Sequence, residues 1–162
     1  MTETERAYMA ALIDGEGCVS MFVNNWNTAR AKHGIAGRST LVRLGVGVCD
    51  ELFMRALVRR WPGAALHARR SRNPAWSTMW YAAWTGERAA RVLRQVRPYL
   101  RLKRRQADLL IQWVALAHRE RRYPGRGGGV GYSDVVMRRR DGYIEKMRAL
   151  NRRGAPPIRE NG

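Results

Sequence analysis

Cysteine, histidine and lysine are scarce in this sequence of 162 residues, and long apolar runs are absent. The two cysteines, Cys18 and Cys49, have no spacing suited to a zinc site, and the three histidines do not cluster. We therefore expect no structural zinc and reduced thiols, as is typical of an intracellular protein. No apolar stretch reaches the length of a membrane span, and residues 1–6 do not begin a signal peptide.

Acidic residues are also few. The chain has 31 Lys and Arg against 13 Asp and Glu, which gives a formal net charge of +18 and a pI near 11.5. Such an excess favours a polyanionic partner, with nucleic acid as the first candidate, although ribosomal and basic membrane-surface proteins share this composition. Most basic residues are arginine, which suits bidentate contacts with phosphate and guanine. Because Lys32, Lys103 and Lys146 are the only lysines, the position of a lysine is informative.

The polar and apolar patterns predict an alternation of helices and strands. Thr2 and Glu5 form a capping-box pattern for a first helix, which Gly15 or Gly17 then ends. Alternation of period two predicts strands, and apolar positions at helical spacing predict helices. The predicted elements are a helix over 3–14, strands over 18–25 and 39–48, a helix over 50–60 begun by Asp50, strands over 65–70 and 77–84, a helix begun by Thr85 and broken at Pro98, and a helix over 102–118.

This order predicts an α+β domain with an αββαββα core, an antiparallel sheet covered by helices on one face, and extra C-terminal helices. We expect the core domain to span residues 1–121. A glycine-rich linker follows over 122–132. Ser133 caps a further helix within 133–154, and 155–162 form a disordered tail.

The segment 9–17, MAALIDGEG, carries the strongest functional signal. A small, apolar helix runs into two acids separated by a glycine. A carboxylate held at a helix end, beside glycines that allow close approach, can hold a divalent metal. An ordinary buried helix with an acidic C-terminal turn gives the same pattern. The nonamer resembles the signature of the LAGLIDADG homing endonucleases, from which it departs at Met9, Ala11, Gly15 and Glu16.

The resemblance extends over residues 8–116. The element order is similar to that of the family core, and the segment 98–107, PYLRLKRRQA, resembles the turn that precedes a helix with an early lysine near the scissile phosphate. The resemblance implies that Glu16 and Lys103 are catalytic and that Glu16 and the Gly15 carbonyl bind Mg²⁺, with Mn²⁺ or Ca²⁺ able to replace it for binding. Lys103 is otherwise one more cation in the basic run 101–105. Family members often place a polar side chain near the end of the second strand, where this chain has Gly47 to Cys49.

One such motif supplies too few acids for a two-metal site, and the chain has no second copy. A homodimer solves this, because a twofold axis brings two first helices and both Glu16 side chains together. We expect Ala7, Ala10, Ala11 and Asp14 in the dimer interface. Asp14 is interpreted as a helix-end or interface residue rather than as a ligand.

The sheet face opposite the helices is the predicted DNA-binding surface, although a solvated strand face has the same pattern. Trp76, Trp80 and Trp84 are interpreted as core residues rather than as base-stacking platforms. The predicted DNA-binding residues are Ser20, Phe22, Asn24, Trp26, Arg30, Lys32, Arg38, Arg43, His67, Arg69, Arg70, Arg72, Met79 and Tyr81.

The resemblance therefore implies a homodimeric, Mg²⁺-dependent endonuclease that cuts both strands of a long pseudo-palindromic DNA site. Two alternatives keep the fold without DNA cleavage: a DNA-binding regulator and an intron RNA-splicing maturase. A more distant alternative is a basic, ribosome-associated protein without sequence preference.

Overall fold

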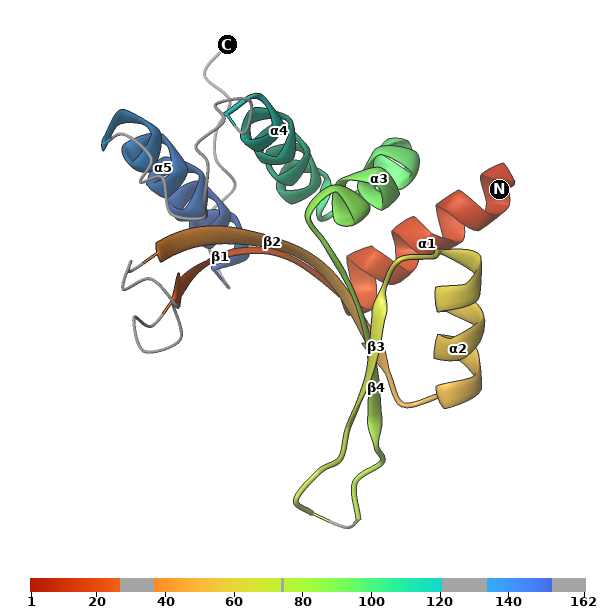
Figure 1. Ribbon diagram of the computed structural model, residues 1–162. Helices are drawn as coiled ribbons and strands as arrows, with labels where there is room; N and C mark the ends of the chain where they lie inside the picture. The colour runs from red at the N-terminus through yellow and green to blue at the C-terminus, as the bar shows by residue number, and fades with distance from the viewer. Residues whose placement is uncertain (27–36, 74, 121–133, 153–162) are drawn as a thin grey trace.

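A computed structural model describes residues 1–26, 37–73, 75–120 and 134–152 of the chain (Figure 1). The predicted order of helices and strands is confirmed. The predicted linker, 122–132, and the predicted tail, 155–162, lie outside the described residues. None of the described helices is both long and apolar enough to cross a membrane. The elements are α1 (Glu3–Glu16), β1 (Gly17–Trp26), β2 (Gly37–Val48), α2 (Glu51–Arg60), β3 (Ala65–Arg69), β4 (Met79–Thr85), α3 (Gly86–Val96), the short 3-10 helix η2 (Arg97–Tyr99), α4 (Arg104–Glu120) and α5 (Asp134–Asn151).

The four strands form one antiparallel sheet in the order β1-β2-β4-β3. Figure 1 shows that the sheet arches and that the helices pack on its outer side. Among the described elements no helix covers the inner, concave face. The predicted α+β class, with an antiparallel sheet covered on one face, is confirmed.

The core lies between the outer face of the sheet and the helices. The alternating positions of the strands predicted this face correctly, because Val19, Leu44 and Val46 are all buried. Trp84 in β4 is fully buried, and its indole Nε1 donates a hydrogen bond of 3.0 Å to the carbonyl of Trp61. Burial of each large apolar side chain contributes about 1.5–3 kcal/mol, so this face holds the sheet against the helices.

The three tryptophans of the β4 region differ in environment. Trp84 is in the core and Trp80 is half-buried, but Trp76 is 70% exposed. The interpretation of Trp76 as a core residue is therefore wrong. Its position lies in the hairpin between β3 and β4, which extends beyond the helices in Figure 1, so no element covers it. Within this hairpin, the Asn73 side chain accepts a hydrogen bond of 3.0 Å from the Ala75 N–H.

Helix α1 begins at the predicted cap and ends later than predicted. The Thr2 hydroxyl accepts a hydrogen bond of 3.2 Å from the Glu5 N–H, and the Glu5 carboxylate accepts one of 2.7 Å from the Thr2 N–H. The helix continues to Glu16 because Gly17, not Gly15, is its C-cap. A Cβ at position 17 would lie 2.6 Å from the Ile13 carbonyl oxygen, so only glycine fits there.

The predicted caps at Asp50 and Thr85 differ from each other, and the third, Ser133, lies outside the described residues. The Asp50 side chain accepts a hydrogen bond of 2.8 Å from the Phe53 N–H at the start of α2, as expected of a cap. Thr85 occupies the N-cap position of α3, but its side chain makes no capping hydrogen bond. Thr85 therefore precedes α3 as predicted, but it does not cap the helix with its side chain.

An ion pair between Glu5 and Arg60 joins the start of α1 to the end of α2. The hydrogen bond from Arg60, followed by the one from the Thr2 backbone, lowers the pKa of Glu5 from 4.5 to about 2. Because the pKa is lower in the folded than in the unfolded chain, the ion pair stabilises the fold above about pH 4.5 and this stabilisation is lost as the pH falls toward 2.

We expect Glu5→Gln to lower the melting temperature modestly at pH 7 and to have progressively less effect between pH 4.5 and pH 2.5. Thermal unfolding followed by circular dichroism across this range measures the difference. Glu3→Gln, in the same turn of α1, is the matched control. A Glu5→Gln effect that stays constant down to pH 2.5 would show that the carboxylate charge does not contribute.

Candidate functional site

Glu16 lies at the junction of α1 and β1 and is exposed. Its carboxylate makes no hydrogen bond or ion pair with any other described residue. Four other described glutamates, in contrast, are each paired with an arginine: Glu5, Glu51, Glu87 and Glu145. The last turn of α1 contains no basic residue of its own, and Glu16 lies at the negative end of the helix dipole. Such an unpaired carboxylate is well placed to bind a cation.

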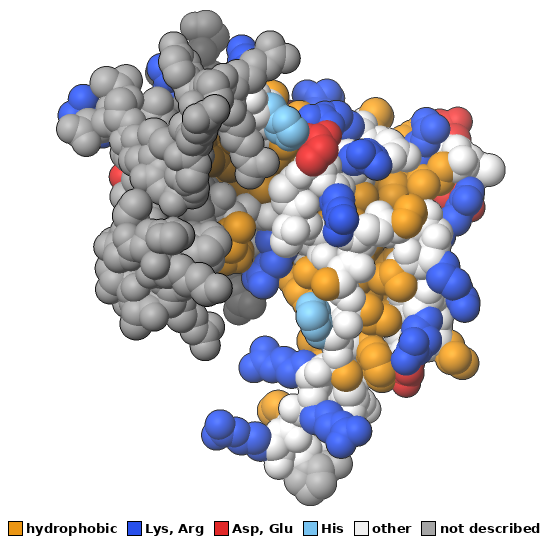
Figure 2. Space-filling view, in the orientation of Figure 1, with side chains coloured by type: hydrophobic (Ala, Val, Ile, Leu, Met, Phe, Trp, Pro, Cys, Tyr) orange, Lys and Arg blue, Asp and Glu red, His pale blue; other side chains and the backbone are white. Residues whose placement is uncertain are grey.

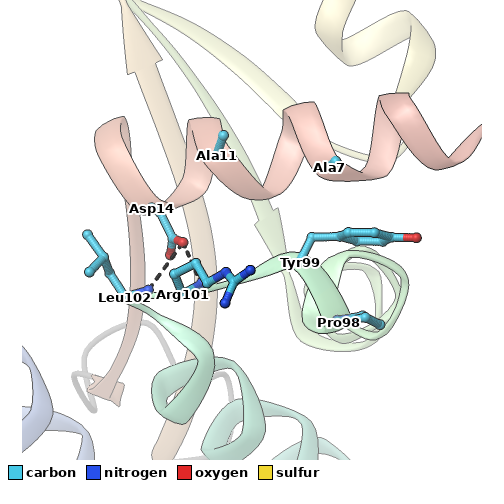
Figure 3. Close-up of a pocket in the computed structure, with 7 residues that line it drawn as sticks. All are labelled: Ala7, Ala11, Asp14, Pro98, Tyr99, Arg101 and Leu102. Atoms are coloured by element: carbon cyan, nitrogen blue, oxygen red, sulfur yellow. Dashed lines mark hydrogen bonds between the residues drawn. The ribbon is translucent and has the colours of Figure 1, made fainter.

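The other acid of the motif, Asp14, is fully engaged within the chain. Its Oδ2 accepts hydrogen bonds from the N–H groups of Arg101 at 2.7 Å and Leu102 at 3.2 Å, and its Oδ1 accepts one from the Lys103 N–H at 2.9 Å. Figure 3 shows the side chain pointing from α1 toward this backbone segment. Asp14 therefore attaches the end of α1 to the start of α4, and both of its carboxylate oxygens already accept hydrogen bonds.

Lys103 lies at the same helix end. Its ammonium group donates a hydrogen bond of 2.5 Å to the carbonyl oxygen of Asp14, and its own carbonyl accepts one of 3.0 Å from the Ala107 N–H. Helix α4 consequently begins at Arg104, later than predicted, because the N–H groups of residues 101–103 are directed to Asp14 instead. The fold thus places the Lys103 ammonium group at the carbonyl of Asp14, which precedes Glu16 by two residues in α1.

We expect Asp14→Ala to lower the free energy of unfolding by about 2–3 kcal/mol, because three charge-assisted backbone hydrogen bonds are lost together. Asp50→Ala is the matched control. It removes one capping hydrogen bond and is expected to cost about 1 kcal/mol. Urea unfolding measures both. A loss for Asp14→Ala no larger than that for Asp50→Ala would mean that Asp14 does not hold α1 to α4.

The outer face of α1 consists mainly of small or apolar residues. Tyr8 is 57% exposed, Ala11 and Gly15 are exposed, and a Cβ at position 15 would meet nothing within 4 Å. The spacing of these residues places them on one face of the helix. Next to this face is a surface pocket of about 510 Å³ (Figure 3). It is lined by Ala7, Ala11, Asp14, Pro98, Tyr99, Arg101 and Leu102.

The residues predicted for the dimer interface are placed differently. Ala11 is exposed and Ala7 is half-buried, but Ala10 is fully buried against the core with Ile13. Ala10 therefore has no surface to offer a partner. The motif did not point to Tyr8 or to Leu102, which is 74% exposed beside the pocket. The helical spacing of Tyr8 from Ala11 is a signal that could have identified the first of them.

The concave sheet face collects many of the predicted DNA-binding residues. Ser20 lies opposite Arg43 across β1 and β2, and His67 lies opposite Tyr81 across β3 and β4. Arg69 and Met79 form the next pair along the same hairpin, and Phe22 is 37% exposed near Arg43. Arg70 and Arg72 are exposed in the hairpin beyond β3. Asn24, Trp26 and Arg38 belong to β1 and β2, and Arg30 and Lys32 lie outside the described residues.

Two glycines in β2 leave room for the Tyr81 ring. A Cβ at position 45 would lie 1.6 Å from the Tyr81 hydroxyl oxygen, and one at position 47 would lie 3.0 Å from its Cδ2. Burial raises the pKa of Tyr81, so its hydroxyl remains protonated at neutral pH. The absence of a polar side chain at position 47 thus has a packing cause, because the aromatic ring from β4 occupies the space.

Basic side chains outnumber acidic ones on the face of the molecule that Figure 2 shows. Figure 2 shows lysine and arginine around the β3–β4 hairpin and over the helices, with few acidic groups between them. Across the described ranges, no cluster of three or more His, Cys, Asp or Glu side chains within one chain is arranged to hold a metal ion. Of the two acids in the motif, only Glu16 makes no hydrogen bond or ion pair with another described residue.

Comparison with known proteins gives matches among solved structures. No family model matches the sequence, and no curated protein does. The homing endonuclease I-CvuI, in complex with the I-CreI target, matches with a TM-score of 0.68 and 18% identity over 91% of this chain and 82% of that one. The archaeal intron-encoded homing endonuclease I-Vdi141I, complexed with DNA, matches with a TM-score of 0.68 and 10% identity over 97% and 90%. The LAGLIDADG homing endonuclease I-SmaMI, bound to cleaved DNA, matches with a TM-score of 0.59 and 16% identity over 94% of this chain and 45% of that one. The chain therefore has the fold of the LAGLIDADG homing endonucleases.

Proposed function

We propose that this protein is a homodimeric, Mg²⁺-dependent, site-specific DNA endonuclease that cuts both strands of a long pseudo-palindromic site. One observation carries the proposal: Glu16 has an exposed carboxylate that pairs with no other described residue, at the end of α1 where Lys103 binds the Asp14 carbonyl. The formal net charge of +18 supports a DNA partner. The solved structures with this fold include several bound to DNA, which supports the same partner.

The proposed dimer forms through the outer face of α1. This face carries a flat aromatic ring at Tyr8, a methyl group at Ala11 and no side chain at Gly15. Two copies of α1 can therefore approach closely around a twofold axis. Gly15 is adjacent to Glu16, and its Cβ position faces open space. Contact between the two helices there brings two Glu16 side chains to the axis. The exposed Leu102 adds apolar surface beside the same face.

The proposed metal ligands fit Mg²⁺ only when two chains come together. The motif of one chain offers a single carboxylate without a described partner, that of Glu16, whereas a dimer offers two such carboxylates and two Gly15 carbonyls. These are oxygen ligands, which Mg²⁺ prefers, and Mn²⁺ or Ca²⁺ would replace it for binding. The Gly15 carbonyl is among the last four of α1, which have no partner within the helix. A bound Mg²⁺ supplies neutralisation of the phosphate charge and an activated water.

Lys103 supplies positive charge at the same point. Its ammonium group has three donors, and one of them is held by the Asp14 carbonyl. The hydrogen bond fixes the position of the side chain and leaves two donors for a phosphate oxygen or for the attacking water. Asp14 acts as a positioning residue, because its carboxylate and carbonyl hold Lys103 at the end of α1.

The proposed DNA-binding surface is the concave sheet face. A two-stranded β-ribbon fits the major groove of B-DNA, where its side chains reach the edges of the bases. The exposed Arg69, Arg70 and Arg72 of the hairpin are suited to phosphate contacts, which fix the register of a protein on the duplex. Affinity for DNA should therefore fall steeply with salt concentration.

In a second candidate function, the protein binds DNA or RNA but does not cleave it. The end of β2 offers Gly47, Val48 and Cys49, and Leu52 just beyond it is 80% exposed. None of Gly47, Val48 and Cys49 has a charged side chain to act on a phosphate. A DNA-binding regulator or an intron RNA-splicing maturase would tolerate this. Tight binding without metal, and no cleavage of the bound sequence, would favour the second candidate.

Selection from a randomised DNA library tests the proposal. Purified protein is incubated with the library and Mg²⁺, and the cleaved molecules are amplified and sequenced. The proposal predicts a palindromic consensus that is cleaved on both strands. A reaction without enrichment, in a library from which the same protein does enrich bound molecules, would support the non-cleaving alternative.

A further inference from the structure

We propose that Arg43 reads one guanine in each half-site and that Phe22 and Tyr81 hold its guanidinium group in position. The inference rests on the proposed DNA-binding function. It assigns a base and a chemical role to one residue of the concave sheet face. Four observations carry it: the aromatic rings beside Arg43, the packing of Tyr81, the free donors of Arg43 and its place in the sheet.

The Arg43 guanidinium lies between two aromatic rings. Its central carbon is 5.4 Å from the centre of the Phe22 ring and 5.7 Å from the centre of the Tyr81 ring. Phe22 belongs to β1, Arg43 to β2 and Tyr81 to β4, so rings from both neighbouring strands flank the charged group. Attraction between a cation and an aromatic ring operates over such distances. The guanidinium is therefore more restricted than an arginine side chain that extends freely into solvent.

The Tyr81 ring is itself fixed by the backbone beneath it. Gly45 and Gly47 leave no side chain on β2 at the two positions that the ring covers. Their absent Cβ atoms would lie 1.6 Å from the Tyr81 hydroxyl oxygen and 3.0 Å from its Cδ2. The glycines of β2 and the tyrosine of β4 thus form one side of a preorganised holder for Arg43.

The guanidinium group of Arg43 makes no hydrogen bond or ion pair with the described residues. Its Nε is buried and has no hydrogen-bond partner among the described residues. Arg55, Arg60 and Arg94, in contrast, are paired with glutamates. Because Nε is enclosed, the two terminal amino groups remain to bind a ligand. The two terminal amino groups of a guanidinium can donate together to O6 and N7 of guanine. This is the commonest specific contact of arginine in the major groove.

The position of Arg43 in the sheet favours a base over a phosphate. Strand β2 is an interior strand, with β1 on one side and β4 on the other. The arginines that suit phosphates lie on the edge strand β3 and in its hairpin. When a sheet enters the major groove, its interior strands face the base edges and its edges face the two backbones. A fixed, forked donor at the centre is the arrangement that direct readout requires.

The test compares the sequences bound by wild-type protein and by Arg43→Lys, selected from a randomised library in Ca²⁺ so that cleavage is not needed. We expect the wild-type consensus to contain one guanine column, repeated in each half-site, that Arg43→Lys loses while the other columns stay. On duplexes that differ only by guanine or adenine there, wild type should discriminate about 10- to 100-fold and Arg43→Lys less than about 3-fold. Lysine keeps the charge, so affinity for random DNA should change by less than about 3-fold.

Three further variants separate reading from positioning. Tyr81→Phe keeps the ring and should retain the discrimination, whereas Tyr81→Leu removes it and should reduce the discrimination about 5-fold or more. Arg94→Lys, in α3 on the helix side of the sheet, should leave the consensus unchanged. A guanine column that survives in Arg43→Lys, or an equal loss of affinity for every sequence, would overturn the inference and identify Arg43 as a phosphate contact. A wild-type protein that enriches no sequence at all would overturn the proposed function, and the inference with it.

Discussion

Glu16→Gln is expected to abolish DNA cleavage while DNA binding is retained. The substitution preserves the shape of the side chain but removes the charge that would hold a divalent cation. Because Glu16 is exposed and bonded to no other described residue, the fold should not depend on it. A metal-assisted step that loses a carboxylate ligand should slow by about 10³-fold or more.

The measurement is the single-turnover rate of cleavage of a plasmid that carries the selected site, with affinity for the same site measured in Ca²⁺. Glu3→Gln is the matched control, since it makes the same chemical change at the other end of α1. The control should cut at the wild-type rate. Loss of binding together with cleavage in Glu16→Gln would mean that Glu16 is structural, and retained cleavage would exclude it from the reaction.

Ala11→Arg is expected to convert the proposed dimer into monomers and to abolish cleavage. Ala11 is exposed on the outer face of α1, so a long side chain there should not disturb the fold of a single chain. In a twofold dimer the two arginines would meet near the axis, where both their bulk and their like charges oppose contact. Cleavage should fall about 100-fold or more, because each monomer then brings only one Glu16 carboxylate to the proposed metal site.

Analytical ultracentrifugation gives the mass of the protein alone and on DNA, and the plasmid assay gives the activity. Ala115→Arg is the matched control, because Ala115 is an equally exposed alanine of a helix and lies in α4. It should remain dimeric and active. An Ala11→Arg protein that still forms dimers through the same face and cuts DNA would contradict the proposed interface.

Local pattern predicted the elements of this fold well. The capping box at Thr2 and Glu5 is present, and the alternating positions of β1 and β2 identified the buried face correctly. Element boundaries differed where a long-range contact decides them. Helix α4 begins late because Asp14, far away in the sequence, accepts the preceding N–H groups. No periodicity in the sequence reports such a contact.

The candidate site was predictable in part. The nonamer located Glu16, and the scarcity of lysine drew attention to Lys103, but neither showed that Lys103 is held by the Asp14 carbonyl. The burial of Ala10 follows from the phase of α1, which the motif alone does not fix. Whether Trp76 is covered depends on how far the helices extend over the sheet. This is a property of the packed domain and not of the strand pattern.

The central claim is that two copies of this chain bring their Glu16 carboxylates together around divalent cations. Anomalous diffraction from crystals of the protein on its selected DNA site, grown with Mn²⁺, tests it most directly. The account predicts two chains on each duplex and Mn²⁺ peaks in contact with the Glu16 carboxylates at the twofold axis. A single chain on the duplex, or Mn²⁺ peaks bound away from Glu16, would contradict it.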